Sequence, residues 1–130
     1  MKIQPDRLEG VNAISRHETG RVWVNARLHE HSVLVPWRGP VTAWPVAQLQ
    51  ALSAAHFEQV LALAPELVIF GSGTRLRFIP PALSRGLVER GIGMETMDTA
   101  AACRTYNVLA SEGRSVVAAL LIEDIAGTGA

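Results

Sequence analysis

The fold is decided by the stretch Pro65-Glu66-Leu67-Val68-Ile69-Phe70-Gly71-Ser72-Gly73. Its segment 67–70 is short and wholly apolar, and it is followed directly by a turn that contains Gly71 and Gly73. A short apolar run bounded by turn residues predicts a strand that is buried on both faces. We therefore expect a sheet whose two faces are covered by other elements.

Three helices are expected around this strand. The first begins after the candidate N-cap Ser53 and ends at Pro65, because apolar residues recur at helical spacing between them. The second has Pro81 in its first turn and Gly91 just past its end, which is the usual asymmetry of helix ends. The third begins at the candidate N-cap Thr99.

Strands at 92–97 and 115–122 complete a β-α-β-α-β order, which predicts a helix-covered sheet with right-handed crossovers between parallel strands. The N-terminal half instead alternates with period two, and the turn Glu18-Thr19-Gly20 between segments 11–17 and 21–25 is typical of a hairpin. Further short strands are expected at 32–35 and 41–44, each before a proline. We expect one α/β domain over residues 1–130, ordered from about 11 to 122, in which an N-terminal β-meander packs on or extends the sheet.

Composition and charge exclude several classes of protein. Of the 130 residues, 48% are hydrophobic and 18% are charged, and the net charge is zero. This hydrophobicity excludes intrinsic disorder, and the neutral balance argues against a nucleic-acid-binding protein. Cys103 is the single cysteine, so the chain can form neither an internal disulfide nor a multi-cysteine zinc site. The sequence shows no signal peptide and no long apolar run, so we expect a cytoplasmic protein without membrane insertion.

A second group of motifs follows the strand 92–97. It consists of Asp98-Thr99 and then Ala102-Cys103-Arg104-Thr105-Tyr106-Asn107-Val108-Leu109-Ala110-Ser111-Glu112-Gly113-Arg114. Together with the segment 65–73, these motifs resemble the family that includes the mitochondrial complex I assembly factor three and the adipogenesis-associated Mth-type domain protein. The resemblance runs from about Val11 to Ile122. It implies a three-layer fold, in which a central mixed five-stranded sheet carries flanking helices and an added β-layer. It implies no reaction, and bacterial members are mostly described as a domain of unknown function.

A candidate ligand pocket lies where the strands end, because open α/β sheets bind ligands at the carboxyl ends of their strands. The residues expected to line it are Gly71, Ser72, Gly73, Asp98, Thr99, Tyr106 and Asn107. The glycine turn matches neither the dinucleotide-binding motif nor the P-loop, so no cofactor is expected. Each residue also has a structural role open to it, such as a tight turn for the glycines, a helix cap for Asp98 or Thr99, and packing for Tyr106.

A second candidate site is a surface. The four cationic residues Arg75, Arg77, Arg85 and Arg90 lie in a span whose one acidic residue is Glu89. Such a basic patch either holds an acidic partner or is simply solvated. Trp37 lies in a tryptophan- and proline-rich segment, and we expect it at an interface or packed over its own sheet.

The sequence predicts no catalytic residue and no metal site. Cys103 has no histidine nearby in sequence, which favours a small buried hydrophobe over a nucleophile. His29 and His31 would share one face of a strand, but a third metal ligand is missing. Two functions remain open. We favour a non-enzymatic interaction or assembly-helper module that binds a protein partner, itself a monomer or weak homodimer; the alternative is a small-anion or small-ligand binding domain, or an enzyme, with its pocket at the glycine turn.

Overall fold

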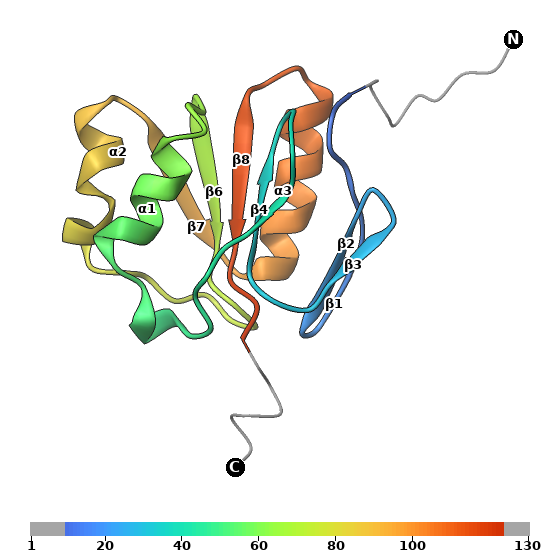
Figure 1. Cartoon of the computed structure of the whole chain (residues 1–130), viewed down its shortest axis with the longest axis horizontal. Coiled ribbons are helices and arrows are strands. Elements are labelled where there is room, and N and C mark those ends of the chain that lie inside the picture. The colour runs from blue at the N-terminus through green and yellow to red at the C-terminus, as the bar shows by residue number, and fades with distance from the viewer. Residues whose placement is uncertain (1–9, 124–130) are drawn as a thin grey trace, which may run out of the picture.

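The computed structural model describes residues 10–123, which form two sheets with helices packed on them (Figure 1). The larger sheet has five strands in the order β5-β4-β8-β6-β7. These strands are β4 (Val33–Pro36), β5 (Thr42–Ala43), β6 (Leu67–Gly71), β7 (Gly93–Met97) and β8 (Val116–Leu120). The strands β6, β7 and β8 run parallel, whereas β4 is antiparallel to both β5 and β8. The expected mixed five-stranded sheet is therefore confirmed.

The smaller sheet is antiparallel and consists of β1 (Ile14–Glu18), β2 (Arg21–Val24) and β3 (Arg27–His29). The hairpin expected around residues 18–20 is confirmed, and Gly20 has the positive φ of 82° that this turn requires. The strand expected from residue 11 begins later, at Ile14. Before that point the backbone N–H of Asn12 bonds to the carbonyl of Trp37 instead, so the chain is paired with another segment.

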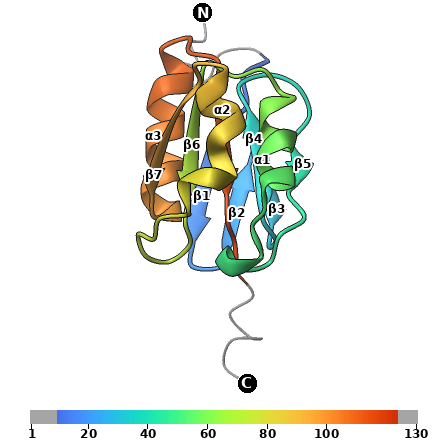
Figure 2. The same ribbon diagram turned by 90° about the vertical axis from the view of Figure 1, so that its left-hand side faces the viewer.

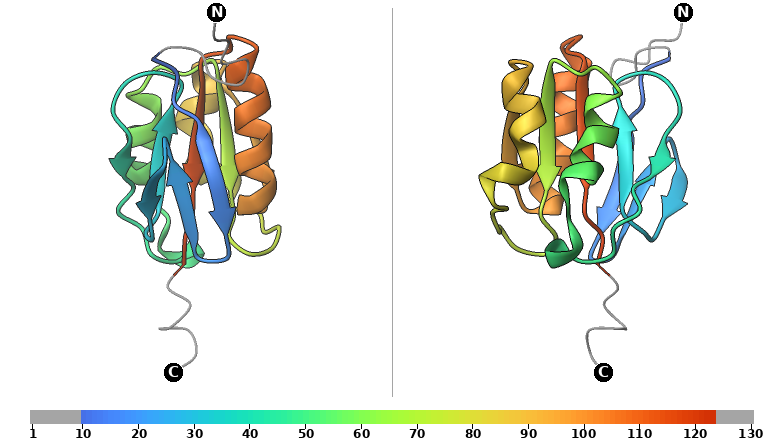
Figure 3. Two further views of the ribbon diagram at one scale, coloured as in Figure 1. Left: turned by 90° about the vertical axis from the view of Figure 1, so that its right-hand side faces the viewer. Right: turned by 60° about the vertical axis from the view of Figure 1, so that its left-hand side comes forward.

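The elements form layers. One face of the five-stranded sheet is covered by α1 (Ala54–Leu61), η2 (Pro81–Ser84) and α2 (Arg85–Glu89), which come forward in Figure 2. The other face is covered by α3 (Thr99–Ser111) together with the three-stranded sheet, which lie side by side in Figure 3. A short η1 (Leu49–Ala51) precedes α1. The expected layered α/β fold with an added β-layer is confirmed.

The central strand β8 shows why both faces are covered. Its residues are all buried, and alternate side chains join two different cores. Val116, Ala118 and Leu120 pack with α3 and the three-stranded sheet, whereas Val117 and Ala119 pack with α1 and α2. Because successive side chains of a strand point to opposite faces, one apolar run without polar interruptions serves both cores.

The helix ends differ in detail from the expected ones. Ser53 is the N-cap of α1 as expected, and its backbone N–H donates to Nδ1 of His56 (3.0 Å). However, α1 ends at Leu61 and not at Pro65. The N-cap of α3 is Asp98 and not Thr99, since the carboxylate of Asp98 accepts a hydrogen bond from the backbone of the third helical residue.

No helix within residues 10–123 combines the length and the apolar character needed to cross a lipid bilayer.

Candidate functional site

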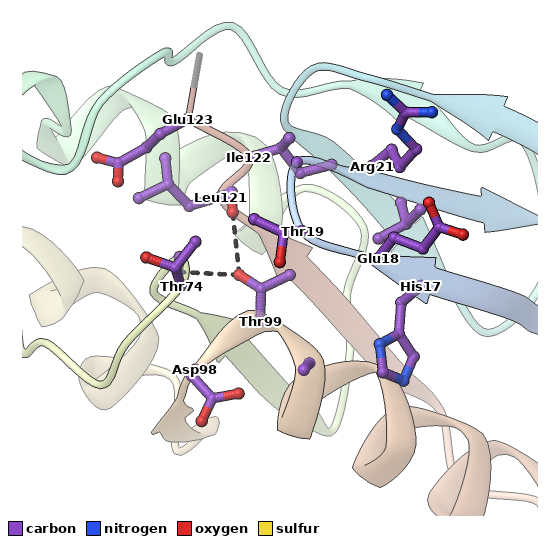
Figure 4. A pocket seen from close by; sticks show the side chains of 14 residues that line it. His17, Glu18, Thr19, Arg21, Thr74, Asp98, Thr99, Leu121, Ile122 and Glu123 are labelled. Atoms are coloured by element: carbon purple, nitrogen blue, oxygen red, sulfur yellow. Dashed lines mark hydrogen bonds between the residues drawn. The ribbon is translucent and has the colours of Figure 1, made fainter. Parts of the chain in front are cut away.

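The carboxyl ends of β6, β7 and β8 meet at one edge of the sheet, and a cavity of about 270 Å³ opens there (Figure 4). Segments 73–74, 98–100 and 121–123 follow these three strands and form one side of the cavity. Residues 17–22, at the turn between β1 and β2, form the other side. The cavity therefore lies between the central sheet and the added β-layer, at the edge where the topology predicts a ligand.

Thr99 ties the three strand ends together. Its hydroxyl donates to the carbonyl of Leu121 (2.9 Å) and accepts from the backbone N–H of Gly73 (2.9 Å), as the dashed lines in Figure 4 show. Its own backbone N–H donates to the carbonyl of Gly73 (2.8 Å). Nearby, a Cβ on Gly71 would lie 3.0 Å from the Cα of Thr99, so β6 and α3 can approach this closely only with glycine at position 71. One wall of the cavity is thus rigidly built.

The loop that leaves β6 is held by Ser72 and Arg77. The buried hydroxyl of Ser72 donates to the carbonyl of Arg75 (2.8 Å) and accepts from the backbone N–H of Arg77 (3.0 Å). The guanidinium of Arg77 donates to the carbonyl of Ser72 and pairs with the carboxylate of Glu123, both at 2.7 Å. Every one of these bonds is partly buried, so residues 72–77 have a fixed conformation.

Of the seven residues expected at the pocket, Gly73, Asp98 and Thr99 line the cavity, whereas Gly71 and Ser72 are buried and do not line it. Tyr106 and Asn107 lie farther along α3 and hold the added β-layer. The buried hydroxyl of Tyr106 bonds to the carbonyl of Asn12 (2.9 Å), and its pKa is raised because burial disfavours the phenolate. The side-chain amide of Asn107 accepts from the backbone N–H of Ile14 (2.9 Å) and donates to its carbonyl (2.8 Å).

Most charges around the cavity are paired. Glu123 pairs with Arg77, Glu18 with Arg16, and Arg21 lies 3.9 Å from Glu30. Asp98 forms no ion pair with another residue in the range 10–123, and the bond we find at its side chain is the capping bond from α3. Asp98 is therefore the lining carboxylate that is free for a further partner within the part of the chain that the structure describes.

The residues expected at a surface are spread over several environments. Arg75, Arg85 and Arg90 are exposed, and Arg77 is half-buried in the contacts described above. Trp37 is half-buried against the core, and its indole N–H donates to the carbonyl of Ala110 (3.1 Å).

Two residues that the sequence analysis did not single out are prominent on the same loop. Leu76 is 51% exposed and Phe78 is 71% exposed, although both are large and apolar. A signal for them exists in the sequence, because they stand between a glycine turn and a pair of prolines, where no helix or strand pattern provides a face to bury them.

The remaining candidates for chemistry do not line the cavity. Cys103 is fully buried, and this burial raises the pKa of its thiol to about 12, so the thiol stays protonated at neutral pH. The pKa of His29 is lowered, first by burial and then by the nearby Arg27. Among residues 10–123, no group of three histidine, cysteine or carboxylate side chains is placed to hold a metal ion.

Comparison with known proteins gives a consistent set of relatives. A family profile described as "Protein of unknown function (DUF498/DUF598)" matches residues 14–121. NADH dehydrogenase (ubiquinone) 1 alpha subcomplex assembly factor 3 of Bos taurus is 37% identical over 83 residues, which make up 62% of this chain and 45% of that protein. The chain thus spans about half the length of the curated relatives that it matches first.

Two solved structures are similar over nearly their whole length. A crystal structure of a Bordetella parapertussis protein has a TM-score of 0.84 and 37% identity, and the match covers 90% of this chain and 100% of that one. A solution structure from Bordetella pertussis, described as a Mth938-like domain, has a TM-score of 0.82 and 30% identity over 98% of both chains.

Proposed function

The chain belongs to the DUF498/DUF598 family of proteins of unknown function, and within that family we propose that it acts as a protein-interaction or assembly-helper module. Its contact surface is the loop from Thr74 to Pro80, between β6 and η2, which we call the β6–η2 loop. The observation that carries the proposal is the exposure of Leu76 and Phe78 on this loop.

The exposure of these side chains is costly in the isolated chain. A large apolar side chain left in water forgoes about 1.5–3 kcal/mol of burial free energy. A rearrangement of the loop could bury Phe78 against the rest of the chain. The hydrogen bonds of Ser72 and Arg77 oppose such a rearrangement, because they fix the backbone that precedes Phe78. A rigid loop that presents a phenylalanine and a leucine loses little conformational entropy when it binds a partner. The loop therefore has the properties of a preformed docking element.

The charge around the loop specifies the partner further. Arg75 is exposed beside Leu76, Arg85 is exposed at the start of α2, and Arg90 is exposed just past the end of this helix (Figure 2). None of the three forms an ion pair with another residue in the described range. We infer a partner protein whose contact surface combines an apolar pocket for Phe78 with carboxylates at its rim.

The names of the relatives support a role of this kind. The matched mammalian proteins are named assembly factors, and an assembly factor works by contacting other proteins. The match to the family covers the part of the chain that carries the β6–η2 loop, since the family profile matches residues 14–121.

The test compares two sets of exposed apolar residues. The double variant Leu76→Ser/Phe78→Ser alters the β6–η2 loop, and Val108→Ser is the matched control, because Val108 is 55% exposed on α3. Tagged chains are used to capture proteins from a lysate of the source cells, and the bound proteins are quantified by mass spectrometry. We expect one acidic protein to be retained by the unaltered chain and by Val108→Ser, and to be lost from the double variant.

Circular dichroism and thermal unfolding accompany the capture, and all three chains are expected to melt within about 4 °C of one another, because each exposed substitution changes stability by no more than about 0.5 kcal/mol and the double variant carries two. Retention of the same proteins by the folded double variant would rule out the β6–η2 loop as the contact surface.

A further inference from the structure

The cavity between the added β-layer and α3 shares one residue, Thr74, with the β6–η2 loop, and its own construction points to a ligand. It is walled by four segments from distant parts of the sequence, and its apolar lining includes the buried residues Val22 and Ile122, which belong to the core on the α3 side of the sheet. Its volume of about 270 Å³ lies just below the range of about 300–1,000 Å³ found for drug-sized ligands. The cavity therefore suits a small molecule with a short apolar body.

The polar groups at the cavity set the charge of that molecule. Three lining carboxylates, those of Glu18, Asp98 and Glu123, stand against one guanidinium, that of Arg21. Glu18 and Glu123 already pair with arginines outside the lining. Asp98 has no such partner in the described range, and a carboxylate that accepts one backbone bond keeps further acceptor positions.

An anion would be the obvious alternative, because the cavity borders the N-terminus of α3 and helix N-termini attract negative charge. Asp98 already supplies that negative charge as the N-cap of α3. A second anion at this position would face the carboxylate of Asp98 directly. The arrangement therefore favours a cation over an anion.

We propose that this cavity binds a small primary amine, whose ammonium group pairs with the carboxylate of Asp98 and whose short apolar chain contacts Val22 and Ile122. Ammonium groups on alkyl chains are protonated at neutral pH, with a pKa of about 10. The ammonium group donates up to three hydrogen bonds, and the hydroxyl of Thr74 and the side chain of His17 lie on the same lining to accept one.

The experiment titrates the protein with butylammonium chloride and follows backbone amide signals by two-dimensional NMR. Sodium butyrate and butanol are the matched anionic and neutral probes of the same length. The amides of Thr19, Gly20, Thr74 and Ala100 line the cavity and report on it. We expect saturable shifts at these amides with butylammonium and no saturation with butyrate.

The variant Asp98→Asn removes the charge and keeps the helix cap, because asparagine caps as well as aspartate does. We expect it to weaken butylammonium binding about tenfold, which is the usual effect of losing one charged hydrogen bond. Glu58→Gln, on the exposed side of α1, changes the net charge equally and should leave binding unaltered.

Saturable binding of butyrate at the same amides, butylammonium binding that is unchanged by Asp98→Asn, or no saturation with butylammonium would each overturn the proposal. These outcomes are independent of the partner capture, because no residue altered here lies on the β6–η2 loop.

Discussion

The side chain of Asn107 hydrogen-bonds both the N–H and the C=O of a residue in β1, as the backbone of a neighbouring strand would. Replacing Asn107 therefore tests how the added β-layer is attached to α3. The side-chain amide of Asn107 makes two hydrogen bonds with the backbone of Ile14, at 2.9 and 2.8 Å. Each hydrogen bond contributes about 1 kcal/mol net, so Asn107→Ala should destabilise the chain by about 2 kcal/mol. At about 2.1 cal/mol/K per residue, the unfolding entropy of 130 residues is about 0.27 kcal/mol/K, and the melting temperature should fall by about 7 °C.

Asn107→Asp adds a dependence on pH. One oxygen of the new carboxylate can still accept from the backbone N–H of Ile14. The other oxygen replaces the side-chain N–H of Asn107 and faces the carbonyl oxygen of Ile14, to which that N–H donated. This repulsion raises the folded-state pKa of the new carboxyl above the unfolded value of about 3.9. The protonated carboxyl can donate to that carbonyl, so the bond is present below about pH 3.9 and is lost as the pH rises through the folded-state pKa.

Thermal unfolding by circular dichroism at pH 7 and near pH 4 checks both variants against the unaltered chain. At pH 7 we expect Asn107→Asp to be at least as destabilised as Asn107→Ala, by about 2–3 kcal/mol. Near pH 4 the aspartate variant should recover relative to the alanine variant. An aspartate variant that is as stable as the unaltered chain at pH 7, or that fails to recover near pH 4, would refute the attachment of β1 through this side chain.

Three further predictions follow from buried or paired groups. The thiol of Cys103, whose pKa is raised to about 12 by burial, should react with a disulfide reagent at pH 8 after denaturation, and rapid reaction in the native chain would contradict its burial. Gly71→Ala should lower the free energy of unfolding in urea by about 1–3 kcal/mol, because the added Cβ would lie 3.0 Å from the α3 backbone, whereas the control Gly93→Ala, with its nearest atom at 3.4 Å, should change it by less than about 1 kcal/mol. The carboxyl pKa of Glu66 is lowered first by a backbone hydrogen bond and then by Arg114, so an NMR titration of Arg114→Ala should show only a partial rise in that pKa, and a complete return to the ordinary value would contradict the backbone bond.

Much of the fold could be predicted from local patterns. The buried strands β6 and β8 are short, continuous apolar runs, and a short run of this kind between turn residues is typical of a strand that is covered on both faces. The missed strand β3 is exposed along most of its length, so its sequence carries no alternation. The sequence favoured Thr99 as the N-cap of α3 but left Asp98 open, because both are good capping residues and the backbone geometry decides between them in favour of Asp98.

The candidate site could be predicted from the sequence only in part. Parallel strands of one sheet have their carboxyl ends at the same edge, so the predicted topology alone places Gly73, Asp98 and Thr99 there, and all three line the cavity. Tyr106 stands eight residues beyond Asp98, and at 1.5 Å per residue that is about 12 Å along α3, too far to reach the strand ends. The opposite wall, residues 17–22, depends on where the added β-layer sits, and no local pattern specifies that position.

The place of β8 in the sheet has a consequence for the synthesis of the chain. Among the eight strands in residues 10–123, β8 comes last in sequence but lies between β4 and β6, so the sheet is two separate pieces until residue 120 has left the ribosome. Until then the inner edges of β4 and β6 have unpaired backbone groups, and such edges readily pair with other chains. Nascent chains thus expose these edges until β8 has been made, and a premature stop before β8 would leave a product that cannot close its sheet.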